Sequence, residues 1–188
     1  MDERALVRRS KLLSRVLRHQ PSLAGLTLGP GGWVAVDGLL RGLSAYTGAS
    51  VTRDELDEIV ANNDKRRFAY DETGTRIRAS QGHSVEVNLE LTATQPPETI
   101  YHGTSARAVE AIQREGLRKM RRHHVHLSPD IPTAIKVGAR RGRPVVFAVA
   151  SGEMARDGAA FYRSDNGVWL VEAVPPRYLT LVMPREEG

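Results

Sequence analysis

The most informative absences in this 188-residue chain are those of cysteine, aromatic residues and long apolar runs. With no cysteine, the chain has no disulfide scaffold, thiol nucleophile or cysteine-ligated zinc. Aromatic residues make up only 5%, so we expect a core of Leu, Val, Ile and Ala. No stretch approaches the roughly 18 apolar residues of a membrane span, and residues 1–13 lack the apolar segment of a secretion signal. We therefore expect a cytoplasmic protein that makes no membrane contact.

Four common catalytic signatures are also absent. The phosphate loop GxxxxGK[ST] and the dinucleotide fingerprint GxGxxG do not occur, which argues against a P-loop NTPase and a Rossmann dehydrogenase. Neither the serine-hydrolase motif GxSxG nor the zinc-protease motif HExxH is present. A catalytic site in this chain must therefore use other residues.

Arginine is the residue that the sequence has in excess. Lys and Arg total 27 against 22 acidic residues, a formal net charge of +5, and 23 of the 27 cations are arginines. Arginine binds phosphate through two parallel hydrogen bonds and stays charged when partly desolvated, so this ratio favours a phosphate-bearing partner. Codon bias in a GC-rich genome produces the same ratio, so the positions of the arginines matter more than their number.

A boundary between two structural parts is predicted near residues 91–97. Small polar residues lead there into the pair Pro96-Pro97, which neither a helix nor a central strand tolerates. With 40% hydrophobic and 26% charged residues, the composition is that of a globular protein. We therefore predict an α+β protein of two lobes, residues 1–92 and residues 93–188.

The first lobe has the pattern of three helices followed by a β-hairpin. Apolar residues share one face of a predicted helix over 4–18. Thr52-Arg53-Asp54-Glu55 is a capping box that opens a helix ending near Asn62, and strand-like segments at 67–70 and 75–79 flank a turn. This order predicts a winged helix, a variant of the nucleic-acid-binding helix-turn-helix. The other face of the first helix, which is either solvated or a nucleic-acid surface, carries Arg4, Arg8, Lys11, Arg15 and Arg18.

Short strands alternate with helices in the second lobe. The predicted strands are 99–102, 125–127, 144–150, 167–173 and 178–183, and the predicted helices are 105–115 and 128–140. This alternation is typical of a mixed α+β lobe and leaves its topology open.

Three cationic clusters in the first lobe indicate phosphate binding. They are Arg18 beside His19 at a helix end, the run Lys65-Arg66-Arg67 before the hairpin, and Arg76 and Arg78 alternating along one strand. An ordinary solvated surface rarely concentrates so many cations in one small lobe. We therefore favour a phosphate-binding interface, such as a surface that contacts a nucleic acid.

A histidine-rich segment, Met120 to Ser128, distinguishes the second lobe. His124 and His126 alternate along a strand and face one way, as two metal ligands would. The flanking arginines repel a cation and no carboxylate or cysteine joins the pair, so we expect no metal. Together with Tyr101-His102-Gly103-Thr104, the segment suits a hydrogen-bonded ribose or nicotinamide better.

Seven stretches of the sequence resemble the RNA 2′-phosphotransferase family. They occur in the family's order from Leu12 to Leu179 and read LLSRVLRHQP, GGWVAVDGLL, NDKRRFAYDETGTRIRASQGHS, YHGTS, MRRHHVHLS, KVGARRGRP and NGVWLVEAVPPRYL. HGT alone is a weak motif, whereas RASQGHS and RHHVHLS together are highly specific. The resemblance implies a winged-helix lobe followed by an ADP-ribosyltransferase-like lobe.

The resemblance also implies a set of site residues. The catalytic residues would be Arg18, His19, Arg67 and Arg122, with Arg66 and Arg121 as the neighbouring alternatives. The RNA phosphate would be bound by Arg18, His19, Lys65, Arg66, Arg67, Arg78 and Arg122. NAD⁺ would be bound by Tyr101, His102, Gly103, Thr104, His126, Ser128, Asp130 and Val168. Val168 stands where many protein-modifying relatives carry Glu, which disfavours protein modification.

The activity implied by the resemblance is NAD⁺-dependent removal of an internal, splice-junction type RNA 2′-phosphate. The phosphate first attacks NAD⁺ and expels nicotinamide; RNA with a free 2′-hydroxyl and ADP-ribose 1″,2″-cyclic phosphate are then released. The expected partners are tRNA-like 2′-phosphorylated RNA and NAD⁺, with a monomeric protein and no metal. The alternatives are ADP-ribosyl transfer to a protein, a small molecule or another RNA or DNA phosphate end, and a non-enzymatic winged-helix nucleic-acid-binding protein.

Overall fold

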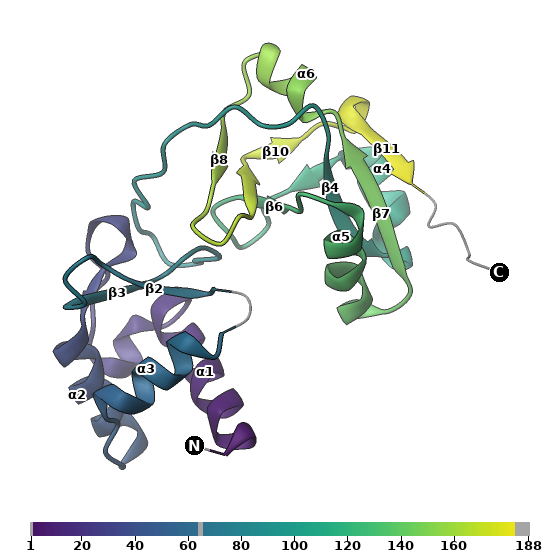
Figure 1. Ribbon diagram of the computed structural model, residues 1–188. Helices are drawn as coiled ribbons and strands as arrows, with labels where there is room; N and C mark the ends of the chain where they lie inside the picture. Colours follow the sequence, from purple (N-terminus) through teal and green to yellow (C-terminus); the bar gives the residue numbers. More distant parts are fainter. Residues whose placement is uncertain (1, 64–65, 183–188) are drawn as a thin grey trace. The chain divides into compact units, whose positions relative to one another are not determined.

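The computed structural model describes residues 2–63 and 66–182, which form two compact units (Figure 1). The first unit is Met1–Glu90 and the second is Leu91–Gly188. Both contain helices and small antiparallel sheets, so the chain is a mixed α/β protein. None of the described helices is long and apolar enough to cross a membrane.

The described part of the first unit contains three α-helices and three strands. In chain order its elements are α1 (Glu3–Arg18), the 3₁₀ turns η1 (Pro21–Ala24) and η2 (Pro30–Gly32), β1 (Val34–Ala35), α2 (Val36–Thr47), α3 (Arg53–Ala61), β2 (Phe68–Tyr70) and β3 (Arg76–Ala79).

Helix α1 supplies one wall of the core of the first unit. The Asp2 side chain accepts a hydrogen bond from the amide of Ala5 and so caps the start of the helix. Leu13 and Leu17 of α1 are buried in a cluster that includes Leu56 of α3. Burial of these aliphatic side chains is the main favourable contribution to folding of a unit that has few aromatic residues.

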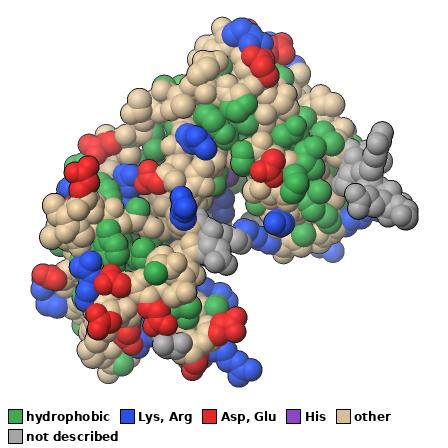
Figure 2. Space-filling model, in the orientation of Figure 1, with side chains coloured by type: hydrophobic (Ala, Val, Ile, Leu, Met, Phe, Trp, Pro, Cys, Tyr) green, Lys and Arg blue, Asp and Glu red, His purple; other side chains and the backbone are tan. Residues whose placement is uncertain are grey.

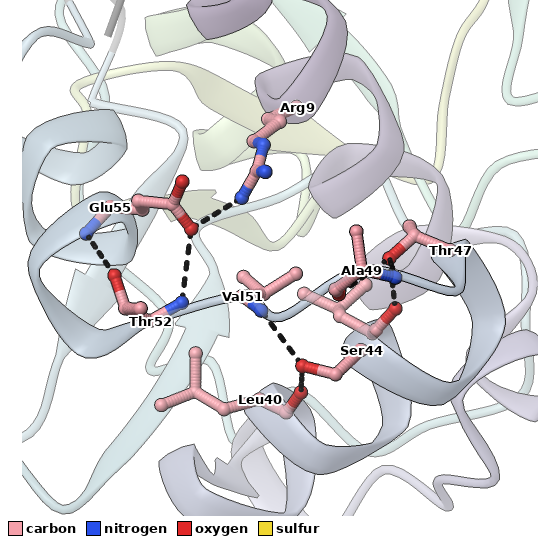
Figure 3. A network of polar contacts seen from close by, with 9 residues as sticks. Arg9, Leu40, Ser44, Thr47, Ala49, Val51, Thr52 and Glu55 are labelled. Carbon is pink, nitrogen blue, oxygen red and sulfur yellow. Dashed lines mark hydrogen bonds and ion pairs between the residues drawn. The ribbon is translucent and has the colours of Figure 1, made fainter.

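A polar network fixes the start of α3 against α1 (Figure 3). Thr52 Oγ1 accepts a hydrogen bond from the Glu55 amide, and the Glu55 carboxylate accepts one from the Thr52 amide, so the predicted capping box is confirmed. The same carboxylate lies 2.5 Å from Nη1 of Arg9. In the same network, Ser44 of α2 accepts a hydrogen bond from the Val51 amide just before α3. The three helices are therefore joined by side-chain bonds as well as by apolar packing.

The predicted hairpin forms, and a third strand joins it. β2 and β3 pair antiparallel, with Phe68 opposite Ala79. β1 pairs with the other edge of β3, with Val34 opposite Ile77, so the strand order is β1-β3-β2. β1 has only two residues, too few to show a two-residue repeat, so the sequence did not reveal it.

The described part of the second unit contains eight short strands and three α-helices. Its elements are β4 (Ile100–Ser105), η3 (Ala106–Ala108), α4 (Val109–Glu115), β5 (Leu117–Arg118), β6 (Val125–Leu127), α5 (Ile131–Gly138), η4 (Ala139–Arg141), β7 (Pro144–Val149), α6 (Ser151–Arg156), β8 (Phe161–Arg163), β9 (Trp169–Val171), β10 (Ala173–Val174), η5 (Pro176–Tyr178) and β11 (Leu179–Val182).

Three antiparallel sheets enclose the core of the second unit. Their strand orders are β11-β7-β4, β6-β9-β8 and β10-β5. Ile100, Phe147, Leu127 and Phe161, which come from the two larger sheets, are almost completely buried in one cluster. The central strands β7 and β9 therefore bring together chain segments that are far apart in the sequence.

The chain entering the second unit is bonded to that unit rather than extended as a linker. Ala93 forms an isolated bridge with Tyr162 on β8, and the Thr94 amide donates a hydrogen bond to the backbone of the same strand. Further on, Glu98 forms a bidentate ion pair with Arg156 of α6, at 2.8 and 3.1 Å. The proline-rich stretch that marked a boundary in the sequence is therefore part of the second unit.

Helix α5 lies against β4 at unusually short range. A Cβ atom on Gly103 would lie 1.7 Å from the carbonyl oxygen of Ala134, and one on Gly138 would lie 2.5 Å from that of Thr104. Both positions thus require glycine, and the contact fixes α5 beside β4.

Candidate functional site

The C-terminal end of α1 brings two predicted site residues next to a third. Arg18 is the last residue of the helix and is half-buried, and His19 is its C-cap. Nη2 of Arg18 lies 3.5 Å from the carbonyl oxygen of Arg67, a long hydrogen bond. Nδ1 of His19 lies 2.8 Å from Oγ of Ser84, and the Ser84 amide donates a hydrogen bond to the carbonyl of Arg18. Arg18 and His19 therefore lie next to the backbone of Arg67, and these three residues form one cluster along the chain backbone of the first unit.

Arg67 is anchored by a buried amide. Its Nη1 donates a hydrogen bond to Oδ1 of Asn63 at 3.2 Å, and Asn63 is only 7% exposed. Its neighbour Arg66 is exposed, with a positive φ of 41°, and its carbonyl accepts a hydrogen bond from Oγ of Ser80. Of the two arginines, Arg67 has the side chain that is already oriented, which favours it for a fixed role in phosphate binding.

Two other predicted phosphate-binding residues do not belong to this cluster as described. Lys65 lies outside the residues that the structure describes. The guanidinium of Arg78 lies over the Trp33 ring, 4.5 Å from its centroid, and Nη1 is 3.4 Å from the carbonyl oxygen of Gly31. Arg78 therefore contacts the segment around η2.

In the second unit, β4 and the end of β6 bring two predicted histidines together. The backbones of Tyr101 and Ser128 pair through hydrogen bonds of 2.9 and 2.6 Å. Nδ1 of His102 lies 3.2 Å from the carbonyl oxygen of His126. Because a carbonyl only accepts, Nδ1 carries the proton, and Nε2 of the neutral ring is an acceptor. Burial lowers the pKa of His102, against the smaller opposing effect of this hydrogen bond, and so favours the neutral form.

His126 has the opposite tautomer. Its Nδ1 lies 3.1 Å from Nη1 of Arg122. A guanidinium only donates, so Nδ1 of His126 is the acceptor and Nε2 of the neutral ring carries the proton. The two rings therefore offer one acceptor and one donor. Arg122 and Arg121 are both exposed, and the bond to His126 distinguishes Arg122 from its neighbour.

Two residues assigned to NAD⁺ binding also have structural roles. Oδ1 of Asp130 accepts a hydrogen bond from the Thr133 amide at 2.7 Å, which caps α5 and lowers the pKa of the Asp130 carboxyl. Gly103 provides the close contact with α5 described above. Thr104, which follows it on β4, is half-buried.

Val168 lies close to the histidines in the strand register. Leu127 pairs with Trp169, which places Val168 opposite Ser128 one residue further along. Side chains alternate across a strand, so Val168 continues the face that carries His126. Oγ of Ser164 is 3.1 Å from both the amide and the carbonyl of Val168, which fixes this turn.

A separate cavity lies at another part of the second unit. It has a volume of about 370 Å³ and is lined by residues of α6, β8, β9, β10 and η5, together with His124, whose ring packs edge-on against Tyr162. Burial lowers the pKa of His124. None of the residues that the sequence assigned to the site lines this cavity.

The structure thus contains two groups of predicted site residues, one in each unit. The group in the first unit is cationic and suits an anion such as phosphate. The group in the second unit pairs a neutral acceptor with a neutral donor, which suits hydroxyl groups of a sugar. Ser84 and Asn63, which orient His19 and Arg67, were not singled out from the sequence; the motif RASQGHS contains the serine, but only the fold shows its partner.

Comparison with known proteins identifies similar sequences over nearly the whole chain. A sequence model of the "RNA 2′-phosphotransferase, Tpt1 / KptA family" matches residues 4–173. A protein named probable RNA 2′-phosphotransferase from Nostoc punctiforme is 54% identical over 179 residues, covering 95% of this chain and 98% of that protein. Proteins of the same name from Streptomyces griseus and Streptomyces coelicolor are each 56% identical, covering 96% and 98% of this chain and 99% and 100% of their own lengths.

Proposed function

The chain belongs to the RNA 2′-phosphotransferase family and is a transferase, and we propose that it removes a 2′-phosphate from RNA with NAD⁺ as a consumed co-substrate. The main support for this proposal is that the fold places Arg18 and His19 next to the backbone of Arg67, and that all three residues have cationic or hydrogen-bonding side chains of the type that a phosphate dianion requires. The preferred substrate would be a tRNA-like RNA with an internal, splice-junction 2′-phosphate.

The first unit would act as the RNA-binding, winged-helix lobe. Its three helices and three-stranded antiparallel sheet support this proposal. Arg18 and Arg67 would hold the phosphate oxygens through their guanidinium groups. His19, kept in place by Ser84, would donate a hydrogen bond to the phosphate.

The second unit would act as the NAD⁺-binding, ADP-ribosyltransferase-like lobe. The donor set fits a sugar: Nε2 of His102 is an acceptor and Nε2 of His126 is a donor, so two adjacent ribose hydroxyls would find complementary partners. Arg122, held by His126, is the cation that this unit supplies for a phosphate. Tyr101, Ser128 and Val168 would complete the binding surface.

The proposed reaction has two steps. In the first, an oxygen of the RNA 2′-phosphate attacks the anomeric carbon of the nicotinamide ribose, and the bond to nitrogen breaks as nicotinamide leaves with the electron pair. In the second, the ribose 2″-hydroxyl attacks phosphorus and the RNA 2′-oxygen leaves, taking up a proton. The products are RNA with a free 2′-hydroxyl and ADP-ribose 1″,2″-cyclic phosphate. Fixed guanidinium groups would stabilise the charge on the phosphoryl oxygens in the second step.

The test is an assay with a short RNA carrying one internal 2′-phosphate. With NAD⁺, we expect release of nicotinamide, ADP-ribose 1″,2″-cyclic phosphate and 2′-hydroxyl RNA, and no reaction without NAD⁺. The same assay with RNA or DNA that carries only a terminal phosphate tests ADP-ribosyl transfer to phosphate ends. Stable ADP-ribosylated product from these substrates, with no turnover of the 2′-phosphorylated RNA, would overturn the proposal.

A further inference from the structure

The exposed face of α1 carries a row of cations that none of the roles above uses. We define this cationic face as Arg4, Arg8, Lys11 and Arg15, all of which are exposed. At about 100° of rotation per residue, the four side chains fall within a sector of about 60° on the side of the helix opposite Leu13. The row follows α1 from its first turn toward Arg18, over about 16 Å between Arg4 and Arg15.

The cationic face has no acidic counterpart on its own helix. The only acidic residue of α1 is Glu3, in the first turn. Arg4, Arg8 and Lys11 make no ion pair or side-chain hydrogen bond with any residue that the structure describes, and Arg15 bonds only the neutral amide of Gln20. Elsewhere on the first unit, in the view of Figure 2, acidic and basic side chains are interspersed.

Arg9 shows how the fold treats a cation on the opposite side of the same helix. Its guanidinium lies 2.5 Å from the Glu55 carboxylate, within the network that joins α1 to α3 (Figure 3). The cation that packs against the unit is therefore neutralised, whereas the row that faces solvent is not.

The arrangement is unfavourable for the free helix. Each successive pair along the cationic face is separated by three or four residues, so like charges are neighbours on the helix surface and repel. Arg4 also places a positive charge in the first turn, where the helix dipole disfavours it. A bound polyanion would remove this repulsion, which gives the cationic face a physical reason to bind one.

We propose that the cationic face binds successive backbone phosphates of the RNA strand beside the reacting nucleotide. A row of cations in line with Arg18 matches a chain of regularly spaced negative charges better than it matches a compact anion. The inference rests on the proposed function in taking RNA as the substrate and Arg18 as a contact of its 2′-phosphate. It adds that affinity depends on RNA length beyond the modified nucleotide.

The test compares two variants that lose the same charge. The first is R4Q/R8Q/K11Q. The control is R41Q/R107Q/R140Q, which removes three exposed cations located elsewhere. Binding is measured by fluorescence anisotropy, without NAD⁺, for a single-stranded RNA of about 12 nucleotides and for a trinucleotide, each with one 2′-phosphate. Both RNAs are titrated over a range of salt concentrations.

We expect the first variant to lose affinity for the longer RNA by about 10- to 100-fold at 0.1 M salt. Each lost phosphate contact reduces the slope of the logarithm of the binding constant against the logarithm of the salt concentration by about 0.7. Loss of three contacts should therefore decrease the magnitude of this slope by about 2. Affinity for the trinucleotide should change much less, and the control should bind the longer RNA as the parent does. Equal losses in both triple variants, or equal losses for both RNAs, would overturn the proposal.

A second measurement separates ligand binding from a structural role. Because the like charges repel, R4Q/R8Q/K11Q should unfold at a higher temperature than the parent at low salt, in the absence of RNA. A lower unfolding temperature would mean that the cations stabilise the fold, contrary to the proposal. The NAD⁺-dependent assay is independent of both measurements. If the protein converts 2′-phosphorylated RNA but the affinity lost in R4Q/R8Q/K11Q does not depend on RNA length, only the role of the cationic face is rejected. If the loss of affinity depends on RNA length but no conversion occurs, only the proposed function is rejected.

Discussion

The Arg122 guanidinium lies 3.1 Å from Nδ1 of His126, and this contact determines which nitrogen of the ring carries the proton. A doubly protonated His126 ring would present a donor and a positive charge to the guanidinium, so the contact favours a neutral ring. The residue four positions away thus sets the hydrogen-bonding role of a histidine on β6. Substitutions at position 122 should act on the histidine as well as on any bound phosphate.

Arg122→Ala should lower kcat by about 10²- to 10³-fold, the usual effect of removing one fixed donor to a developing anion. Arg122→Lys should recover only part of this loss, because an ammonium group cannot form two parallel bonds to a phosphate. Arg121→Ala is the matched control, because Arg121 is exposed as Arg122 is, and this variant should retain most of the parent's activity. Steady-state kinetics with 2′-phosphorylated RNA and NAD⁺ measures all three; an equal loss in Arg121→Ala would contradict the assignment.

Ser84→Ala should lower kcat about three- to tenfold, because the 2.8 Å contact that orients His19 is lost while the backbone bond of Ser84 to Arg18 remains. KM for RNA should change less, since the serine acts through the histidine. Ser84→Thr keeps the hydroxyl and should restore most of the rate. If the threonine variant is as slow as the alanine variant, the hydroxyl does not position His19.

Arg67→Ala should slow the second chemical step more than the first. The second step transfers the phosphoryl group, whose oxygens need a fixed cation, so ADP-ribosylated RNA should accumulate. A denaturing gel of RNA with a radiolabelled 2′-phosphate would resolve this species. Arg66→Ala serves as the control, and we expect it to show only substrate and product. A slower Arg67→Ala reaction without the intermediate would place Arg67 outside the second step.

His102 should make the protein less stable as the pH falls from 7 toward 5. Burial lowers the pKa of His102 in the folded state, so the unfolded chain binds a proton first as the pH drops below about 6.5, and the free energy of unfolding decreases. Burial also lowers the pKa of His124, so this residue should likewise make the protein less stable as the pH falls. Urea unfolding at pH 7.5 and pH 5.5 should show a smaller difference for His102→Gln than for the parent, and a still smaller one for His102→Gln/His124→Gln. An unchanged difference in both variants would contradict a neutral buried His102.

Gly103→Ala should destabilise the second unit by about 3 kcal/mol or more, because the new methyl group would lie 1.7 Å from a backbone oxygen of α5 and neither backbone can move freely. Gly38→Ala is the control: the site is helical, the nearest atom is a leucine methyl at 3.6 Å, and we expect stabilisation by about 0.5–1 kcal/mol. Urea unfolding measures both. A Gly103→Ala protein as stable as the parent would show that α5 can shift away from β4.

Local patterns in the sequence predicted much of the secondary structure. The helix over 4–18, the capping box at Thr52 and the hairpin around 71–74 all form, because each is specified by residues within a few positions of one another. The short elements β1, β8 and α6 were not predicted. Each has two to six residues, too few for a hydrophobic period, and forms because a distant segment pairs with it or packs against it.

In the candidate site too, local motifs predicted some features, and contacts between distant segments determine the others. Motifs identified Arg18, His19 and Arg67, and the fold brings these three together; their roles in phosphate binding stay predictions. The supporting bonds were beyond the sequence, because Ser84 is 65 residues from His19 and no local rule pairs them. The choice between Arg66 and Arg67 likewise needed the contact with Asn63.

The attachment of Ala93 and Thr94 to β8 has a consequence for dividing the chain. β8 is the last strand of its sheet, and these two residues cover part of its outer edge. A cut at Pro96-Pro97, at the end of the predicted boundary region 91–97, would leave that edge with unpaired amides and carbonyls, which recruit strands from other molecules and lead to aggregation. A fragment meant to remain soluble should therefore begin no later than Leu91.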